Sequence, residues 1–278
     1  MGGQQLADGL DFWGFLGSLI LGGIILGIYT GLLGYVGAKT GLSLDLLSQR
    51  AFGEKGSYLP SAMTSFTQIG WFGVGSFVSG GTATPNFARF AKNGKSGAIT
   101  TVVAFFIGNS LMFFFGAVSS IFVGGNDIFE VMVRLNLFYL AVLVLGLNIW
   151  TTNDNALYTA GLGLANIFHQ RKKPMVLLSG IIGTVASVWL YYNFCGWLNI
   201  LNCTLPPVGM ILVLAYFMNK EDFETDQPKL KTIDWFAVAG VILGAIVANL
   251  LHWGIASING MVVAAVCYCV GQAVNKRK

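Results

Sequence analysis

Amides, hydroxyls and one carboxylate are concentrated in residues 148–155, inside a segment that is otherwise apolar on both sides. At about 100° per residue, five oxygen-bearing side chains fall on one helix face. They are Asn148, Thr151, Thr152, Asn155 and Thr159. Oxygen atoms on one face could coordinate a small hard cation or hydrogen-bond a flat polar ligand.

The alternative is that these side chains tie helices together, as Ser, Thr and Asn commonly do inside membranes. They need partners in either case, because no water is available there. Their clustering beside Asp154 favours a binding site. Asp154 itself lies about 120° from the common face, which favours a structural hydrogen bond over a proton-coupling role.

The composition indicates an all-α integral membrane protein. Of 278 residues, 55% are hydrophobic and only 10% are charged, and 37 are glycine. Mean hydropathy is +0.69. Soluble domains carry about 25% charged residues, and glycine-rich apolar helices pack closely in lipid. The apolar runs are continuous, whereas barrel strands would alternate.

Several other classes of function are not indicated. The four cysteines (Cys195, Cys203, Cys267 and Cys269) lack the spacing of metal or redox motifs. The chain shows no nucleophile–base pair or phosphate loop, so we expect neither an enzyme nor a bound cofactor. The net charge of +4 requires no nucleic acid partner. No cleavable signal peptide is evident at the start of the chain.

Seven apolar runs are long enough to cross a bilayer, which takes about 20 residues. They are residues 12–38, 98–123, 135–167, 176–194, 200–218, 235–251 and 255–274. An eighth candidate, residues 60–88, is irregular and interrupted by glycines and polar residues. We therefore expect a polytopic bundle of about eight spans.

The basic residues test this map, because loops on the cytoplasmic side are enriched in Lys and Arg. Of the 16 basic residues, only Arg134 lies outside five clusters that follow alternate spans or close the chain. Two clusters on the same side of the membrane must be separated by an even number of crossings. This holds for every consecutive pair of clusters except the pair that flanks residues 60–88, which is separated by one crossing. We expect either a re-entrant hairpin there or the remains of several spans, joined near Val74-Gly75. The C-terminus is expected in the cytoplasm.

Six motifs make the chain resemble the cytosine permeases of the nucleobase-cation-symport-1 family. They are GLNIWTTNDNALY at 146–158, GIYTGLLGYVGAKTG at 27–41, QIGWFGVG at 68–75, GNSLMF at 108–113, GIIGT at 180–184 and PPVG at 206–209. The resemblance covers nearly every residue. It implies a leucine-transporter-like fold of two inverted five-helix repeats plus two further helices.

Set against that pattern, the chain is a single but incomplete transmembrane domain, with about eight spans instead of twelve. Residues 1–75 correspond to a remnant of helices one to three, and residues 76–278 correspond to helices six to twelve. The implied gap removes the middle of the family's fold and accounts for the inconsistent crossing count. The N-terminal part of helix one is also implied to be missing.

The resemblance also implies a site for a planar base. Its residues are Gln68, Trp71, Ser76, Phe77, Ser79 and Asn148. Trp71 and Phe77 would sandwich the ring, at about 1 to 3 kcal/mol for stacking, and Gln68 and Ser79 would hydrogen-bond its edge. Asn148, Thr151 and Thr152 are implied to contribute to a sodium site, whose other ligands in the family are carbonyls of helix one.

The implied function is symport: import of cytosine or a related nucleobase with a cation across the inner membrane of a bacterium. Sodium is the expected cation, and a proton is the alternative. The lipid bilayer is then an obligatory partner. The alternative is an internally deleted, non-transporting binding or assembly module that associates with itself or with another chain. A channel is not indicated, because no charged ring or hydrophobic gate is evident.

Overall fold

The computed structural model describes residues 12–74, 83–124, 128–225, 228, 230–251 and 253–276. Within these ranges the regular secondary structure is entirely helical. The elements are α2 (Phe12–Thr40), α3 (Leu44–Phe52), α4 (Tyr58–Val74), α5 (Pro85–Ala88), α6 (Gly94–Val103), the π-helical turn η2 (Ala104–Gly108), α7 (Asn109–Val123), α8 (Ile128–Arg134), α9 (Phe138–Phe168), α10 (Lys172–Tyr192), α11 (Phe194–Met218), α12 (Lys220–Glu224), α13 (Trp235–Leu250) and α14 (Ala256–Lys276).

Five stretches of helix in the described chain are long and apolar enough to cross a membrane. They are Leu16–Thr40, Gly94–Val123, Lys172–Leu190, Gly196–Met218 and Ala256–Asn275. Each overlaps one of the predicted spans, and the shorter apolar helix Trp235–Leu250 overlaps a sixth. The seventh prediction corresponds to α9, a helix of 31 residues that contains the polar stretch.

Several predicted boundaries differ from the structure by a few residues, and the start of α11 differs most. Helix α11 begins at Phe194, earlier than the predicted residue 200, because the stretch that contains Gly196 and Asn199 still forms helix. The irregular segment 60–88 contains α4 and the short α5. Residues 75–82 between them lie outside the described residues, and so does the expected join at Gly75-Ser76.

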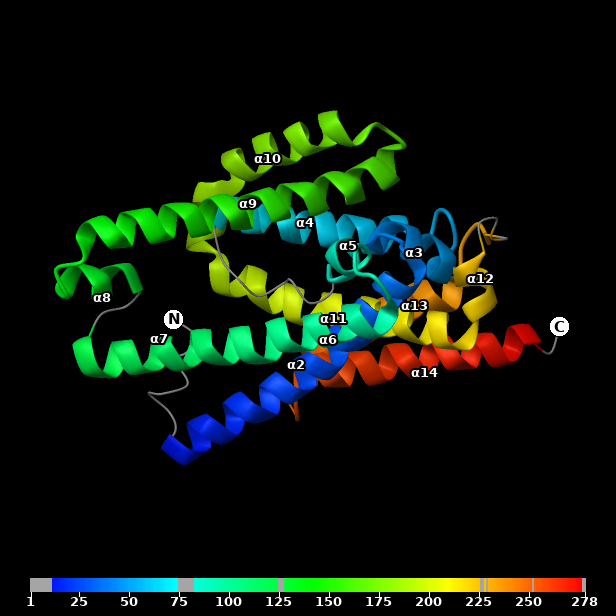
Figure 1. Cartoon of the computed structure of the whole chain (residues 1–278). Coiled ribbons are helices and arrows are strands. Elements are labelled where there is room, and N and C mark those ends of the chain that lie inside the picture. Colours follow the sequence, from blue (N-terminus) through cyan, green and yellow to red (C-terminus); the bar gives the residue numbers. More distant parts are fainter. Residues whose placement is uncertain are drawn as a thin grey trace.

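The long helices form three groups (Figure 1). Helix α2 packs along α6 and η2, and α4 packs against α9 and α10. Helix α11 packs against α13 and α14. Small residues allow the close approach of α2 and α6, since a Cβ on Gly34 would lie 2.5 Å from the hydroxyl of Thr101. The short helices α3, α5 and α12 gather at one end of the bundle, here called the α3 end.

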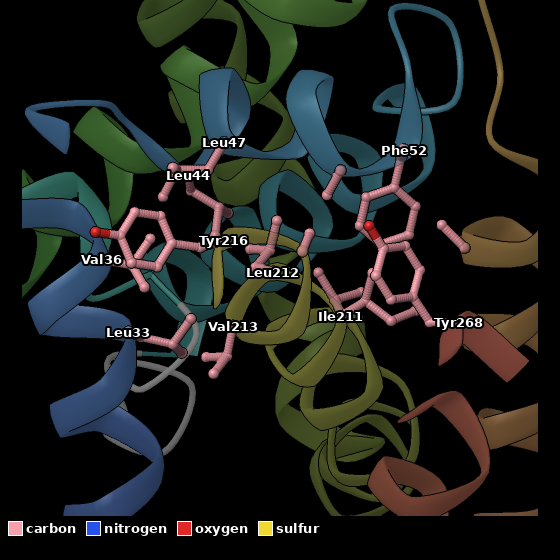
Figure 2. Packing of buried hydrophobic residues seen from close by; sticks show 14 of the residues in the cluster. Leu33, Val36, Leu44, Leu47, Phe52, Ile211, Leu212, Val213, Tyr216 and Tyr268 are labelled. Carbon is pink, nitrogen blue, oxygen red and sulfur yellow. The ribbon is translucent and has the colours of Figure 1, made fainter. Parts of the chain in front are cut away.

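A buried core occupies the α3 end (Figure 2). It joins α2, α3, α11 and α14 through large apolar side chains, among them Leu33, Leu44, Phe52, Leu212 and Tyr268. Helix α3 begins after Ser43, whose hydroxyl accepts from the Leu46 N–H at 3.4 Å. Its apolar residues then face the core. Helix α3 is therefore held by tertiary packing on several sides.

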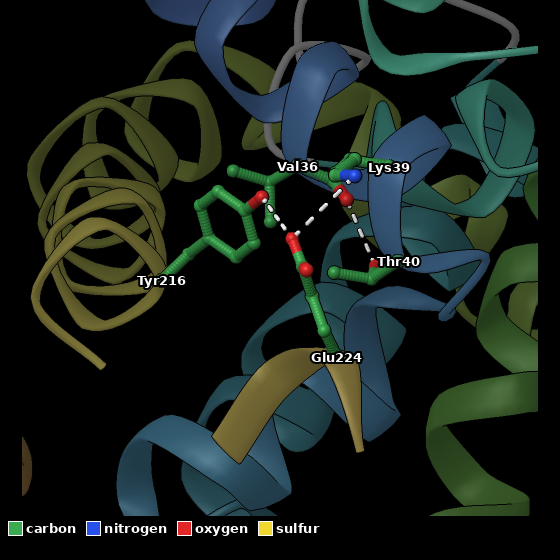
Figure 3. A network of polar contacts seen from close by, with 5 residues as sticks. All are labelled: Val36, Lys39, Thr40, Tyr216 and Glu224. Carbon is green, nitrogen blue, oxygen red and sulfur yellow. Dashed lines mark hydrogen bonds and ion pairs between the residues drawn. The ribbon is translucent and has the colours of Figure 1, made fainter. Parts of the chain in front are cut away.

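Polar contacts fasten the loops around this core. Glu224 of α12 accepts a hydrogen bond from the Tyr216 hydroxyl at 2.9 Å and lies 3.8 Å from the Lys39 ammonium (Figure 3). The Glu54 N–H donates to the Lys231 carbonyl at 2.7 Å. The loop after α3 is thereby bound to the loop before α13.

One of the two carbonyls that the double proline of α11 leaves free is hydrogen-bonded by a neighbouring helix. Pro206 has no N–H to donate to the carbonyl of Asn202, one turn earlier. The Ser257 hydroxyl of α14 donates to that carbonyl at 3.1 Å. Helix α11 therefore continues through the prolines in contact with α14.

Candidate functional site

Helices α4 and α9, which carry the described candidate residues, run antiparallel. The Ser65 hydroxyl on α4 donates to the Ala160 carbonyl on α9 at 3.1 Å. Earlier on α4, the Ser61 hydroxyl accepts from the Asn166 amide, further along α9, at 2.8 Å. A Cβ on Gly163 would lie 2.1 Å from the Ser65 oxygen, so only glycine permits this approach.

A polar network fills the α3 end of this contact. The Asn166 amide donates to the hydroxyls of Ser57, at 3.1 Å, and Ser61. Its oxygen accepts from the Gln49 amide of α3 at 2.6 Å. The Ser61 hydroxyl in turn donates to Asp45 at 2.6 Å. Three helices are therefore joined by side-chain hydrogen bonds.

Asp45 is the buried carboxylate of this network, with 5% of its surface exposed. Burial raises the pKa of Asp45 from 3.8 to about 6. The hydrogen bond from Ser61, a bond with its own backbone and the positive charge of Arg89 act in the opposite direction and offset part of this effect on the pKa.

Gln68 lies on the buried side of α4, about one turn beyond Ser65, and is 8% exposed. If the antiparallel register continues, Gln68 is level with about residue 157 of α9. Close by on α4, Gly70 contacts the buried indole of Trp197 from α11. The Gln68 end of α4 thus faces an aromatic ring and the middle of α9.

The oxygen face of α9 is divided between different surroundings. Asn148 and Thr152 are half-buried, Thr151 and Asn155 are exposed, and Thr159 is buried. The Thr151 hydroxyl donates to carbonyls of its own helix, at 3.2 Å to Leu147 and 3.1 Å to Asn148. These five side chains do not form one described coordination shell.

Gln68 and Asn148 lie at different levels of the bundle. With a rise of about 1.5 Å per residue, Asn148 is roughly 13 Å along α9 from residue 157. The candidates Ser76, Phe77 and Ser79, and the side chain of Trp71, lie outside the described residues. The described part therefore places Gln68 and Asn148 on packed helices but does not bring them together.

Two oxygen atoms of α9 are buried without a partner among the described residues: Asn153 Oδ1 and Thr159 Oγ1. Thr159 belongs to the predicted face, whereas Asn153 does not. Asp154 is exposed and makes no side-chain hydrogen bond within the described chain. The structural hydrogen bond expected for Asp154 is therefore not found there.

Asp45 and Trp197 were not predicted from the sequence. A signal for α3 exists, because Ser43 is a good N-cap and apolar residues recur after it. The burial of Asp45 has no local signal, since it depends on α4 and α9. Trp197 lies in an apolar run where an aromatic residue is unremarkable.

A cavity of about 260 Å³ lies elsewhere, between α2, α11 and α14. Its walls are mainly apolar and include Tyr29, Leu201 and Met261. None of the predicted site residues that the structure describes lines it. It is therefore separate from the α4–α9 site.

Comparisons with known proteins agree with these observations. The family model described as "Permease for cytosine/purines, uracil, thiamine, allantoin" matches residues 1–83 and 74–274. Cytosine permease of Escherichia coli K12 is 35% identical over 369 residues, which cover 99% of this chain and 87% of the relative. Allantoin permease of Bacillus subtilis 168 is 33% identical over 81 residues, 29% of this chain and 16% of the relative.

The solved structure of Mhp1 has a similar fold. It is described as a nucleobase-cation-symport-1 family transporter in a closed conformation with bromovinylhydantoin bound. The TM-score is 0.74, with 98% of this chain and 87% of the Mhp1 chain covered. At 14% identity this likeness shows the fold alone. The family model matches nearly the whole chain, and a cytosine permease is 35% identical over 99% of it. The chain therefore belongs to the family of permeases for cytosine, purines, uracil, thiamine and allantoin.

Proposed function

We propose that this chain binds cytosine or a closely related nucleobase and imports it together with a cation. The observation that carries the proposal is the 35% identity to a cytosine permease over 99% of the chain. The packing of α4 against α9 supports it, because both helices carry residues of the implied site. Binding and transport, rather than chemical conversion of the base, are the expected activities.

The base site is proposed at Gln68, Trp71, Ser76, Phe77, Ser79 and Asn148. An amide such as that of Gln68 can donate to and accept from the edge of a pyrimidine. Gln68 is almost fully buried, and a bound base that left its amide unmatched would carry a free-energy cost. Selection of a base with matching donors and acceptors follows from that cost.

The cation site is proposed at Asn148, Thr151 and Thr152, with Na⁺ as the ion and a proton as the alternative. If Asn148 contacts both ligands, binding of either one orders the helix that the other needs. The two affinities then rise by the same factor, as thermodynamic linkage requires.

The protein is proposed to lie in the inner membrane of a bacterium, with the α3 end and the C-terminus in the cytoplasm. Basic residues support this orientation, because Lys39, Arg50, Lys55 and Lys231 belong to the α3 end. Arg134 is the last residue of α8, which lies at the other end of the bundle (Figure 1).

The chain is proposed to lack helices of the family fold between residues 75 and 76. Two findings support this: the two segments matched by the family model overlap at 74–83, and the 369-residue alignment exceeds the 278 residues of the chain. Transport requires one helix group to move against another. A binding or assembly module without transport is the alternative, which the comparisons do not favour.

Cytosine binding by the purified chain in detergent tests the base site. Gln68→Ala and Trp71→Ala should each abolish binding of radiolabelled cytosine, whereas Asp154→Asn should have a milder effect. Equal binding by all three variants would show that the site is misplaced. Uptake into proteoliposomes distinguishes a transporter from a binding or assembly module. Cytosine binding without uptake by the wild type would favour the module.

A further inference from the structure

Two groups of helices meet through polar side chains at the α3 end. Helices α2 and α6 form one group, and α4, α9 and α10 form the other. Helix α3 continues from α2 and reaches the second group through Asp45 and Gln49. Movement of one group relative to the other would have to break these hydrogen bonds.

A second contact lies beside the first. Arg89, on the segment that leads into α6, donates a hydrogen bond to the Tyr158 hydroxyl of α9. The Lys172 ammonium of α10 lies 3.4 Å from the centre of the Tyr158 ring. Arg89 is thus engaged with α9, and no cation lies within 4 Å of Asp45 in the described chain.

We propose that Asp45 is a proton-binding site that controls the joint between the two helix groups. The neutral carboxyl stabilises the closed joint seen here, and the carboxylate favours an arrangement in which water reaches it. The geometry supports the proposal in three ways: the carboxyl is nearly inaccessible, it has one side-chain donor from α4, and it has no ion-pair partner among the described residues. The proposal is independent of which base or cation is transported.

The direction of the pH effect follows from the pKa. Burial raises the pKa of Asp45 in the closed joint to about 6, from 3.8 for a carboxyl in water. Opening therefore releases a proton between these two pH values, so rising pH favours opening. The opening constant should increase by roughly a hundredfold across this window, tenfold for each pH unit. It should be constant above and below the window.

Other polar and charged groups surround the joint from each packed element. On the α4 and α9 side are Ser61, Asn166 and His169, which stacks edge-on against Tyr58 at 5.8 Å. On the α5 side, Asn86 accepts from the Leu44 N–H at 2.8 Å. The positive charge of Arg89 lowers the pKa of Asp45. On the α11 to α13 side are the Lys39–Glu224 and Lys231–Asp234 pairs, and Arg50 donates to the Asp222 carbonyl.

Infrared titration of the full chain in lipid bilayers tests whether Asp45 binds a proton. The band of a protonated carboxylic acid, taken as wild type minus Asp45→Asn, should disappear with a midpoint near pH 6. Ser61→Ala should move this midpoint upward, because the Ser61 hydrogen bond favours the carboxylate. His169→Gln and Asp154→Asn are matched controls and should leave the midpoint unchanged.

Hydrogen–deuterium exchange of α3 tests the effect on the joint. After correction for the intrinsic pH dependence of exchange, the wild-type amides of residues 44–52 should open more frequently as pH rises from 4 to about 6. Asp45→Asn should stay closed throughout. An infrared midpoint near pH 3.8, the value for a carboxyl in water, would overturn the proposal. The same pH dependence of exchange in Asp45→Asn as in the wild type would also overturn it. If Asp45→Asn fails to fold, an unmoved midpoint in folded Ser61→Ala would also overturn it.

Discussion

The two halves of the α4–α9 contact use the same residue types in different ways. Towards the α3 end, Ser57, Ser61 and Asn166 are joined to one another by hydrogen bonds. Towards the other end, the Thr151 hydroxyl turns back to its own helix, and Asn153 Oδ1 has no partner in the described chain. The first half therefore ties helices together, whereas Thr151 and Asn153 in the second half make no described side-chain hydrogen bond to a neighbouring helix.

This difference bears on the two interpretations of polar residues in membrane helices. Tying neighbouring helices together and binding a ligand were alternatives for the face that begins at Asn148. The structure shows the first role at Asn166, further along the same helix and, at about 100° per residue, on the same face as Asn148. The proposed ligand site would give this single long helix both roles, one in each half. The predictions below test this division.

The largest effect is expected from Gly163→Leu, which would force α4 and α9 apart in the tied half. The new side chain would overlap Ser65, since a Cβ alone lies 2.1 Å from its oxygen. Overpacking should lower stability by about 3 kcal/mol. Thermal unfolding in detergent measures it. Gly146→Leu on the same helix is the control, because a Cβ there meets nothing within 4 Å. Equal destabilisation by both would contradict the proposed packing.

Asn166→Ala should have the next largest effect, because it removes three side-chain hydrogen bonds. At about 1 kcal/mol each, partly recovered by water, the loss should be about 2 kcal/mol. The same unfolding measurement applies. Asn155→Ala is the matched control, since Asn155 is exposed on the same helix. A stable Asn166→Ala would show that the network does not hold the helices together.

The smallest effect on stability is expected from Thr152→Ala, in the half assigned to ligands. Thr152 is half-buried and makes no side-chain hydrogen bond within the described residues. Its loss should weaken the sodium dependence of cytosine binding and leave sodium-free binding unchanged. Binding titrations with and without Na⁺ measure this effect. Sodium-independent binding by the wild type would remove the assignment altogether.

Much of the fold could be predicted from residue patterns. Runs of apolar residues located the long helices, because a bilayer requires about 20 such residues. The prediction of a helical membrane protein is confirmed by the five spans and the likeness to Mhp1. The start of α11 was placed too late, because Gly196 and Asn199 interrupt the apolar run in the sequence but do not end the helix.

The candidate site could be predicted only in part. Gln68 is buried on α4, and Asn148 lies on the helix packed against it. Their separation along the bundle depends on how α4 slides against α9, which the Gly163 contact decides. Nothing in the sequence near either residue encodes that register, and the roles of these residues stay predictions.

The sequence by itself determined that this is a helical membrane protein of the cytosine and purine permease family, because apolar length and local motifs are properties of single segments. Only the tertiary structure decided which polar residues fasten helices to one another. It also decided that Asp45 is buried. Burial is the sum of contacts from α3, α4, α9 and the segment around Arg89, and a sum over distant segments cannot be inferred from any one of them.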